Sequence, residues 1–458
     1  MESKFQVVSL EEVVTIHDAK RKPITKADRK SGPYPYYGAS DIADYIDDYV
    51  FDGVYLLLSE DGDNLRTRNT PIAFIASGKF WVNNHAHVLQ GQDELDTIYL
   101  CYALQYAEID SYISGSTRPK ITQADLKKIP IFAPELKIRR QIAKFVKAFD
   151  EKLALNRQIN KTLEQIAQAL FKSWFVDFDP VVDNALDSGF FEQDLAFPDE
   201  LLRRAEARRA VREHGNFKPL PEATRQLFPA AFEECAEPSL GLGGWVPLGW
   251  AVSHLSDFGN IITGKTPSKS VKDAFGNMSN ENLPFITPTD MGDDTHMQET
   301  VRYLSPISQS ILAKSKIKKG SICVSCIGSQ MGKTMFVDCD AFTNQQINSI
   351  ILNDAQESNF LFCFLRLNRD TLFKLGCGGS TMPILNKSDF SKIKILHPSK
   401  KLITMFSGYT EAIFNKISKN LNQNSTLENL REVLLPKLIS GELRLDQIEA
   451  DLTKEGVA

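Results

Sequence analysis

Short apolar runs separated by polar turns fill two long stretches of the chain, residues 1–135 and 251–399. Each run is only four to seven residues long and is bounded by Gly, Asp, Asn or Pro, which is typical of β-strands. The pattern therefore predicts two β-rich domains, with strands at 54–58, 72–75, 321–327 and 347–352.

A seven-residue period follows each β-rich stretch. It persists over about five heptads, which predicts long coiled-coil helices at 136–176 and 400–440. Pro436 lies inside the second stretch, so that helix should kink or end near it. The expected seam has a-like positions at 142, 149, 156, 163 and 170, with d-like positions at 138, 145, 152, 159 and 166, and it continues at 406, 413, 420, 427 and 434 with 402, 409, 416, 423 and 430.

One polar residue interrupts each seam at an a-like position. It is Asn156 in the first helix and Asn420 in the second, and each lies near the centre of its stretch. If the helices pair antiparallel, the two asparagines face each other, and a buried pair of this kind fixes register and orientation. The alternative is that both lie on a solvated face.

The segment between the first helix and the second β-rich stretch has a different composition. Residues 177–250 are acidic and rich in Pro, Phe and Gly, with a short Arg/Glu/Ala helix expected near 199–214. We interpret them as a linker with partial structure that runs back along the paired helices, and residues 441–458 as a tail. The fold class is then α+β: two β-rich globular domains joined by an antiparallel coiled coil, with pseudo-two-fold symmetry.

An internal repeat relates the two halves of the chain and aligns Gly115 with Gly379. Residues 115–131 and 379–395 align without a gap, 8 of 17 positions are identical, and both segments begin Gly-Ser-Thr-x-Pro. A period this long indicates two whole domains rather than a solenoid. Two like domains in one chain suit a ligand with two half-sites.

Composition and charge narrow the classes of function. The chain is 42% hydrophobic and 24% charged, as in ordinary folded proteins, and no apolar run approaches the ~18 residues that span a bilayer. Scattered cysteines, seven in all, and the lack of a secretory leader favour a reducing cytoplasm. The net charge is −5, and residues 1–135 hold 14 basic and 20 acidic side chains. If this chain binds DNA, partner subunits should supply part of the phosphate contact.

Several catalytic or metal-binding patterns occur without their usual context. Residues 259–266 match the P-loop pattern, but no apolar strand precedes them and Pro267 follows at once, so a Lys/Thr-Pro turn is the better interpretation. Cys323 and Cys326 are expected to be packed thiols rather than zinc ligands. His85 and His87 lack an evident third ligand, and residues 60–63 are expected to form a polar turn. The sequence predicts no catalytic residue and no metal site.

The loops beside the β scaffold remain as candidate sites. Arg, Lys, Asn and Gln on such loops suit contacts with base edges and phosphates, and the alternative is solvated surface turns. The candidate DNA-binding residues are Arg66, Arg68, Lys79, Asn83, Asn84, Arg118, Lys120, Lys265, Lys269, Gln330, Lys333, Asn344 and Gln345.

The repeat and the two helix endings carry a specific resemblance. A Gly-Ser-Thr-x-Pro segment closes each half; the first helix ends at residues 171–180 (Phe-Lys-Ser-Trp-Phe-Val-Asp-Phe-Asp-Pro) and the second at 435–443 (Leu-Pro-Lys-Leu-Ile-Ser-Gly-Glu-Leu). Over essentially its full length the chain resembles the DNA-specificity subunit of Type I restriction–modification systems. The loops carry no part of this resemblance, since target loops vary freely in that family.

The resemblance implies a non-catalytic role. Each globular half would be a target-recognition domain for one half of a split DNA sequence, and the helices would act as a spacer that docks two adenine methyltransferase subunits. S-adenosylmethionine, ATP and Mg²⁺ are then expected on the methyltransferase and restriction subunits, with no cofactor on this chain. Because residues 1–135 are net acidic, residues 41–61 should point away from DNA.

Helix length is compatible with a spacer. A helix of 38 residues is roughly 57 Å long, and half-sites one DNA turn apart need readers about 34–36 Å apart. Two rival hypotheses are a P-loop enzyme, which nucleotide binding by the isolated chain would favour, and a coiled-coil scaffold without DNA contact.

Overall fold

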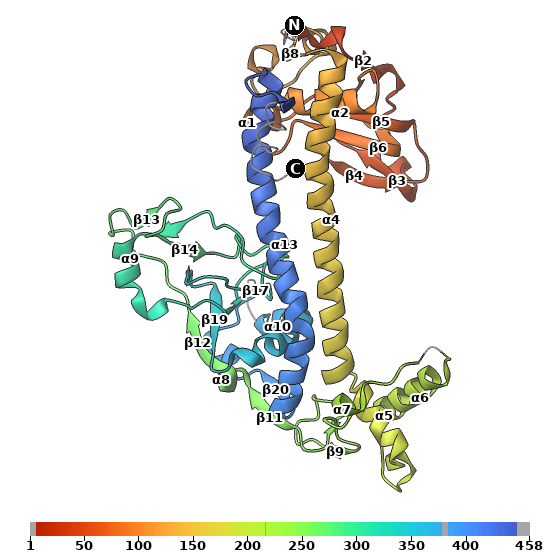
Figure 1. Cartoon of the computed structure of the whole chain (residues 1–458), viewed down its shortest axis with the longest axis vertical. Helices are drawn as coiled ribbons and strands as arrows, with labels where there is room; N and C mark the ends of the chain where they lie inside the picture. Colours follow the sequence, from red (N-terminus) through yellow and green to blue (C-terminus); the bar gives the residue numbers. More distant parts are fainter. Residues whose placement is uncertain (1–5, 216, 378–382, 447–458) are drawn as a thin grey trace. The chain divides into compact units, whose positions relative to one another are not determined.

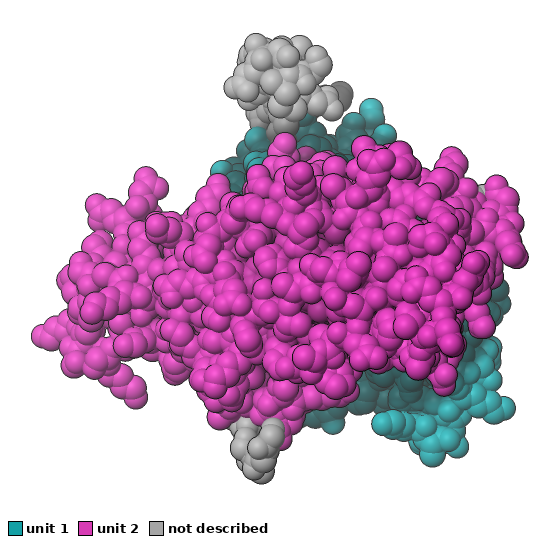
Figure 2. All heavy atoms as spheres, turned by 90° about the horizontal axis from the view of Figure 1, so that it is seen from below, with its two compact units in different colours: residues 1–155, 424–458 teal, residues 156–423 magenta. Residues whose placement is uncertain are grey.

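Both heptad stretches form long helices, α4 (Leu136–Phe175) and α13 (Lys400–Ser440), as shown in Figure 1. The computed structural model of the chain describes residues 6–215, 217–377 and 383–446. These fall into two units: unit 1 holds residues 1–155 and 424–458, and unit 2 holds residues 156–423. Figure 2 colours unit 1 teal and unit 2 magenta. Each unit thus contains one β-rich domain and a segment of both long helices.

In each unit the two helix segments run antiparallel, as the heptads predicted. In unit 1, Arg431 bonds Asp150 at 2.6 Å, whereas Ile142, earlier on α4, lines a hollow with Leu438, later on α13. In unit 2 the same direction is seen, since Asn156 lies opposite Gln423 and the rings of Phe171 and Phe406 are 5.9 Å apart.

The seam lies one residue away from the expected one at its d-like positions. On α4 the residues buried in place of the expected d-like ones each lie one position later: Val146, Leu153, Asn160 and Ala167. The expected d-like Ile166 is 51% exposed. Counting apolar residues favoured Ile159 and Ile166, but packing buries the amide of Asn160 and the small side chain of Ala167 instead. Hydrogen bonding removes most of the cost of burying an amide.

The pairing of the central asparagines also differs from the expected one. Asn156 and Asn420 are both buried in the seam, each 1% exposed, but they do not bond each other. Asn156 donates to Gln423 Oε1 (2.9 Å), and Asn420 donates to Asn160 Oδ1 (2.7 Å). The expected direct pair is therefore wrong by about one helical turn, because centring each stretch gave a slightly shifted register.

Helix α13 continues past Pro436 to Ser440. Leu438 and Ile439 in its last turn are buried in the core of unit 1. Their packing outweighs the single backbone hydrogen bond that proline cannot donate.

Unit 1 is built around one six-stranded sheet with the order β2-β7-β5-β6-β3-β4. Helix α2 packs on β5 and β6, and a separate antiparallel pair, β1–β8, leads directly into α4. The elements are β1 (Val7–Ser9), β2 (Thr15–Ile16), β3 (Ser31–Tyr37), β4 (Ile42–Ile46), β5 (Phe51–Ser59), α1 (Asn64–Thr67), β6 (Ala73–Val82), β7 (Ala86–Gln90), α2 (Glu94–Gln105), α3 (Gln123–Leu126) and β8 (Pro130–Phe132).

The β domain of unit 2 has two four-stranded sheets, ordered β12-β19-β16-β17 and β13-β15-β14-β18. A terminal antiparallel pair, β11–β20, leads into α13. The elements are β11 (Ala251–His254), α8 (Leu255–Phe258), β12 (Gly259–Thr263), β13 (Phe275–Gly276), β14 (Leu283–Ile286), β15 (Tyr303–Leu304), α9 (Pro306–Ile311), β16 (Ile322–Ser325), β17 (Thr334–Phe336), β18 (Phe342–Thr343), β19 (Ile347–Leu352), α10 (Ser358–Leu367), α11 (Arg369–Gly376), α12 (Lys387–Ser391) and β20 (Lys394–His397).

The two β domains share one topology. The order β2-β7-β5-β6 corresponds to β12-β19-β16-β17, with antiparallel neighbours throughout. A parallel pair follows in both, β3 with β6 and β14 with β18. In the alignment of Gly115 with Gly379, the first residue of α2 falls on that of α10, and the first residue of α4 on that of α13. The internal repeat is thus a repeat of the whole domain.

Residues 177–250 form a folded subdomain rather than a linker that runs back along the helices. Phe178 near its start packs on Trp250 at its end, with ring centroids 5.5 Å apart, so the segment begins and ends at one place. Phe228 packs on Trp174 of α4. The elements of this subdomain are α5 (Asp179–Asp187), α6 (Asp199–Glu213), α7 (Glu222–Arg225), β9 (Phe232–Glu234) and β10 (Trp245–Pro247). Helix α6 is the helix expected near 199–214.

Candidate nucleic-acid interface

A set of backbone hydrogen bonds holds together three loops of unit 1. Glu60 N–H donates to the carbonyl of His85 (2.9 Å), and Ile121 N–H donates to the carbonyl of Glu60 (2.9 Å). Gly62 N–H donates to the carbonyl of Pro119 (3.0 Å). The end of β5, the turn before β7 and the Gly-Ser-Thr segment therefore meet at one point.

Unit 2 repeats this arrangement. Cys326 N–H donates to the carbonyl of Gln346 (2.8 Å), and Leu385 N–H donates to the carbonyl of Cys326 (2.9 Å). Gly328 N–H donates to the carbonyl of Pro383 (3.0 Å). We call the three bonds in each unit the loop framework.

The loop framework coincides with the sequence repeat. Pro119 aligns with Pro383 in the repeat, and Ile121 aligns with Leu385. Gly115 makes the turn that brings Pro119 and Ile121 into the loop framework of unit 1. Its φ is +82°, and a Cβ there would lie 2.4 Å from the carbonyl oxygen of Arg118. Residues 379–382 of the second Gly-Ser-Thr-Met segment lie outside the described residues.

Charged side chains surround the framework of unit 1. Arg21 bonds Glu60 at 2.5 Å, and the buried His87 bonds Asp18 at 2.6 Å. Lys120 bonds the other oxygen of Glu60 at 3.1 Å. Burial alone would raise the pKa of Glu60, but hydrogen bonds from Arg21 and Lys120 hold the pKa of this carboxyl below its usual value.

Asp18 behaves in the same way. Its burial acts to raise the pKa, while the hydrogen bond and charge of His87 hold the pKa of Asp18 below its usual value. The Nε2 atom of His87 lies 3.0 Å from the carbonyl of Ile121, so the cluster is tied to the loop framework. Sequence reasoning missed Asp18 and Arg21, because their partners Glu60 and His87 lie far away along the chain.

The corresponding positions in unit 2 are mostly uncharged. Asn348 replaces His87, with its amide 3.5 Å from the carbonyl of Leu385, and Thr263 donates to it at 2.6 Å. Ile327 and Ile384 form the bridge that Asp61 and Lys120 form in unit 1, and Ile384 is 49% exposed. One framework thus carries an ion-pair network in unit 1 and amide and apolar side chains in unit 2.

Three of the predicted cations of unit 1 lie together on these loops. Arg66 donates to the carbonyl of Gly115 (3.0 Å), Arg118 bonds Asp61 at 3.1 Å, and Lys120 bonds Glu60. The side chain of Arg118 is 68% exposed. These cations can therefore reach a ligand while staying anchored to the loop framework.

Two predicted cations of unit 1 have other contacts. Arg68 donates to the carbonyls of Gln105, the last residue of α2, and of Ala107, which indicates a structural role. Lys79 lies over the ring of Tyr49, 4.6 Å from its centroid, and the Tyr49 hydroxyl raises the pKa of this lysine.

Asn83 and Asn344 occupy equivalent positions as turn formers. The Oδ1 atom of Asn83 accepts from His85 N–H (2.7 Å), and that of Asn344 accepts from Gln346 N–H (3.0 Å). Asn344 is only 8% exposed. Sequence reasoning chose both for base contact, whereas the structure uses their side-chain oxygens inside the loops. Asn84, which follows Asn83 in unit 1, is exposed.

The remaining candidates of unit 2 are dispersed over several loops. Lys333 donates to the carbonyl of Met291 (2.8 Å), and Gln345 accepts from Thr266 (2.8 Å). Four of these candidates are exposed: Lys265, Lys269, Gln330 and Gln345. Contact with DNA by any of these residues stays a prediction.

The other motifs have structural explanations. Residues 259–263 of the P-loop pattern are strand β12, and within the described chain no helix begins after Thr266 until α9, so no phosphate cradle forms. Cys323 and Cys326 are buried, and burial raises the pKa of each thiol to about 12. Among residues 6–215, 217–377 and 383–446 there is no cluster of three or more potential metal ligands, and no helix is long and apolar enough to cross a membrane.

Comparison with known proteins identifies the family. The model of the Type I restriction modification DNA specificity domain matches residues 2–165 and 247–429, which is most of the chain. The chain belongs to this family. It is 35% identical over 406 residues to the Type I restriction enzyme HindI specificity subunit of Haemophilus influenzae, covering 85% of this chain and 84% of that protein.

Two other specificity subunits are similar to this chain over nearly its whole length. The MjaIX specificity subunit of Methanocaldococcus jannaschii is 23% identical over 440 residues, covering 91% of this chain and 88% of its own length. The crystal structure of the S subunit from M. genitalium has a TM-score of 0.58 at 14% identity and covers 96% of both chains, which shows a common fold. These relatives are named specificity subunits, the non-catalytic component of their systems.

Proposed function

We propose that this specificity subunit recognises a split, asymmetric DNA sequence, with residues 1–135 reading one half and residues 251–399 the other. The observation that carries this proposal is the shared loop framework with different side chains. Equal backbones place the recognition loops in equivalent positions, while the different side chains select different bases.

The chemistry of the loops supports contact with DNA. In unit 1 the exposed Arg118 and Lys120 suit phosphate oxygens or the acceptors of guanine. In unit 2 the exposed Ile384 suits apolar contact with a thymine methyl group. Both sets lie at the Gly-Ser-Thr-x-Pro segments that precede α4 and α13.

The long helices would dock two adenine methyltransferase subunits, and restriction subunits would join that complex. S-adenosylmethionine, ATP and Mg²⁺ would then be bound by those partners in the cytoplasm. The basic character of α4 supports a role in assembly or phosphate contact, since residues 136–175 hold 9 basic and 3 acidic side chains.

Mapping methylated adenines across the genome of a strain that expresses this subunit with its methyltransferase tests the proposal. We expect one split motif with a fixed gap. Replacing residues 1–135 by the corresponding domain of a relative should change one half of the motif and leave the other half and the gap unchanged. A continuous motif, or a change in both halves, would contradict the assignment of one half-site to each domain.

A further inference from the structure

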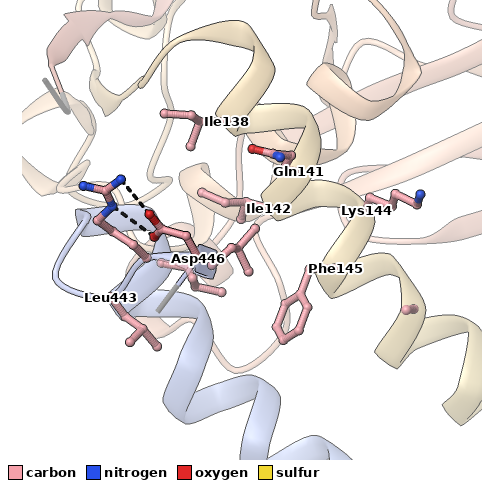
Figure 3. Close-up of a pocket in the computed structure, with 11 residues that line it drawn as sticks. Ile138, Gln141, Ile142, Lys144, Phe145, Leu443 and Asp446 are labelled. Atoms are coloured by element: carbon pink, nitrogen blue, oxygen red, sulfur yellow. Dashed lines mark hydrogen bonds and ion pairs between the residues drawn. The ribbon is translucent and has the colours of Figure 1, made fainter. Parts of the chain in front are cut away.

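Unit 1 contains a hollow of about 560 Å³ beside the start of α4, which we call groove A. Figure 3 shows Ile138, Ile142 and Phe145 of α4 around it. The tail after α13 forms the opposite wall through Leu443 and Leu445. This short wall is held by an Arg444–Asp446 ion pair (2.8 Å), drawn dashed in Figure 3.

Unit 2 contains a hollow of about 780 Å³ beside the start of α13, which we call groove B. Met405, Gly408 and Tyr409 line it from α13, and Leu227 lines it from the residues after α7. The ring of Tyr409 packs edge-on against Trp174, with centroids 5.6 Å apart. The wall of groove B is therefore ordered before any partner binds.

The two grooves are equivalent in the internal repeat. Gln141, Lys144 and Phe145 of groove A align in the repeat with Met405, Gly408 and Tyr409 of groove B. Two equivalent surfaces in one chain suit two copies of one partner.

The glycine at position 408 of α13 has no structural requirement, which indicates that an open groove B is functional. Glycine in the interior of a helix is destabilising relative to alanine. Nothing lies within 4 Å of a Cβ placed there, so neither crowding nor backbone geometry requires glycine. Its lack of a side chain leaves the groove accessible.

Charge indicates what the partner carries. Exposed lysines lie at both grooves, Lys144 at groove A and Lys401 at groove B, and among the described residues neither has an ion-pair partner within 4.0 Å. The first turns of α4 and α13 contain no acidic residue. An apolar anchor beside a carboxylate would complement both surfaces.

We propose that grooves A and B each receive the same apolar and acidic anchor from one of two methyltransferase subunits, and that groove B binds the first copy. This inference rests on the proposed function. Groove B has Met405 and Gly408 where groove A has Gln141 and Lys144, so closing it removes fewer polar groups from water. The 1:1 complex therefore carries its methyltransferase subunit at groove B.

Titrating the full chain with the methyltransferase subunit of the same system, followed by native mass spectrometry, tests this. The wild-type chain should bind two copies, the first at least about tenfold more tightly. Gly408→Trp fills groove B and should weaken the first step by about 30-fold or more, as loss of a buried anchor does. Lys144→Trp should weaken only the second step, and the double variant should bind neither copy.

Matched controls separate filling from folding. Gly408→Ala and Lys144→Ala change the same positions without filling the grooves and should retain both steps. Lys401→Glu, at an exposed position, should weaken the first step even if Gly408→Trp folds poorly. The groove assignment would be overturned if the tryptophan variants and Lys401→Glu bind two methyltransferase copies with unchanged affinities. It would also be overturned if these variants lose only DNA binding. No methyltransferase binding by the wild-type chain would instead refute the proposed function.

Discussion

Replacing Asn420 by leucine tests the amide layer between α4 and α13. Asn420 is 1% exposed and donates to Asn160 Oδ1, which is itself largely buried. Leucine removes the donor and leaves the Asn160 acceptor without its partner in a buried seam. Such an orphaned group costs about 1–3 kcal/mol, so Asn420→Leu should lower the stability of unit 2 by that amount.

The double variant Asn160→Leu/Asn420→Leu should be more stable than Asn420→Leu alone. Replacing both partners removes the orphaned polar atom and adds apolar burial, which makes such exchanges close to neutral. The predicted coupling energy between the two positions is therefore about 1–2 kcal/mol. The cost of the double variant should appear as loss of a unique register rather than loss of stability.

Thermal unfolding followed by tryptophan fluorescence measures this, because Trp174 of α4 packs on Phe406 of α13 in unit 2, with ring centroids 6.0 Å apart. For a domain of this size, about 1 kcal/mol shifts Tm by roughly 2–4 °C. Asn415→Leu, at an exposed position of α13, is the matched control and should shift Tm little. If Asn420→Leu is neutral, or the two substitutions are additive, the amide layer does not hold the seam together.

Three further predictions follow from other regions. Burial lowers the pKa of His296 to about 4, so folding favours its neutral form and stability is lost as pH falls from 6.5 towards 4, by about 3 kcal/mol. Burial raises the pKa of Asp338 to about 6, so its contribution is lost as pH rises from 4 to 6 and opposes that of His296. The free energy of unfolding, measured by urea titration at pH 4.5 and pH 7.5, should therefore give a higher pH 4.5 to pH 7.5 ratio in His296→Gln than in the wild type. In Asp338→Asn the same ratio should be lower. Ratios equal to that of the wild type would contradict the burial of these groups. Maleimide labelling with mass spectrometry should modify the exposed Cys377 first and leave Cys323 unmodified until unfolding, and rapid native labelling of Cys323 would refute its packing. Removing seven residues from α4 and the seven opposite them on α13 should change the permitted gap of the DNA motif or abolish methylation on a library of gap lengths, and an unchanged gap would refute the spacer role.

The repeat and the helices could be predicted from sequence because they depend on local pattern. Heptads identify helices whatever they pack on, and the match of Gly115 with Gly379 appears in any alignment of the chain with itself. The exact seam could not be predicted, since it depends on which neighbours fill the space. Ile166 has the more apolar side chain, yet it is 51% exposed while the neighbouring Ala167 is buried.

Side-chain roles on the loops were the least predictable. Arg68 and Asn83 have the residue types that read bases, but each bonds a backbone group of its own domain. Only tertiary structure decides whether a polar group finds an internal partner. Arg118 lies within the Gly-Ser-Thr-x-Pro segment and Lys120 directly after it, which is why sequence could identify them as candidates.

The buried ion cluster of unit 1 limits how its recognition loops can change. Arg21 bonds both Asp18 and Glu60, and His87 bonds Asp18, so a single substitution removes a partner from a group with little access to solvent. The bonds of the loop framework are formed by backbone atoms and therefore do not depend on these side chains. A new specificity is thus compatible with the fold when the whole cluster is replaced together, as in unit 2, where Asn348 takes the place of His87. Exchange of complete β domains meets this condition, whereas exchange of one cluster residue alone does not.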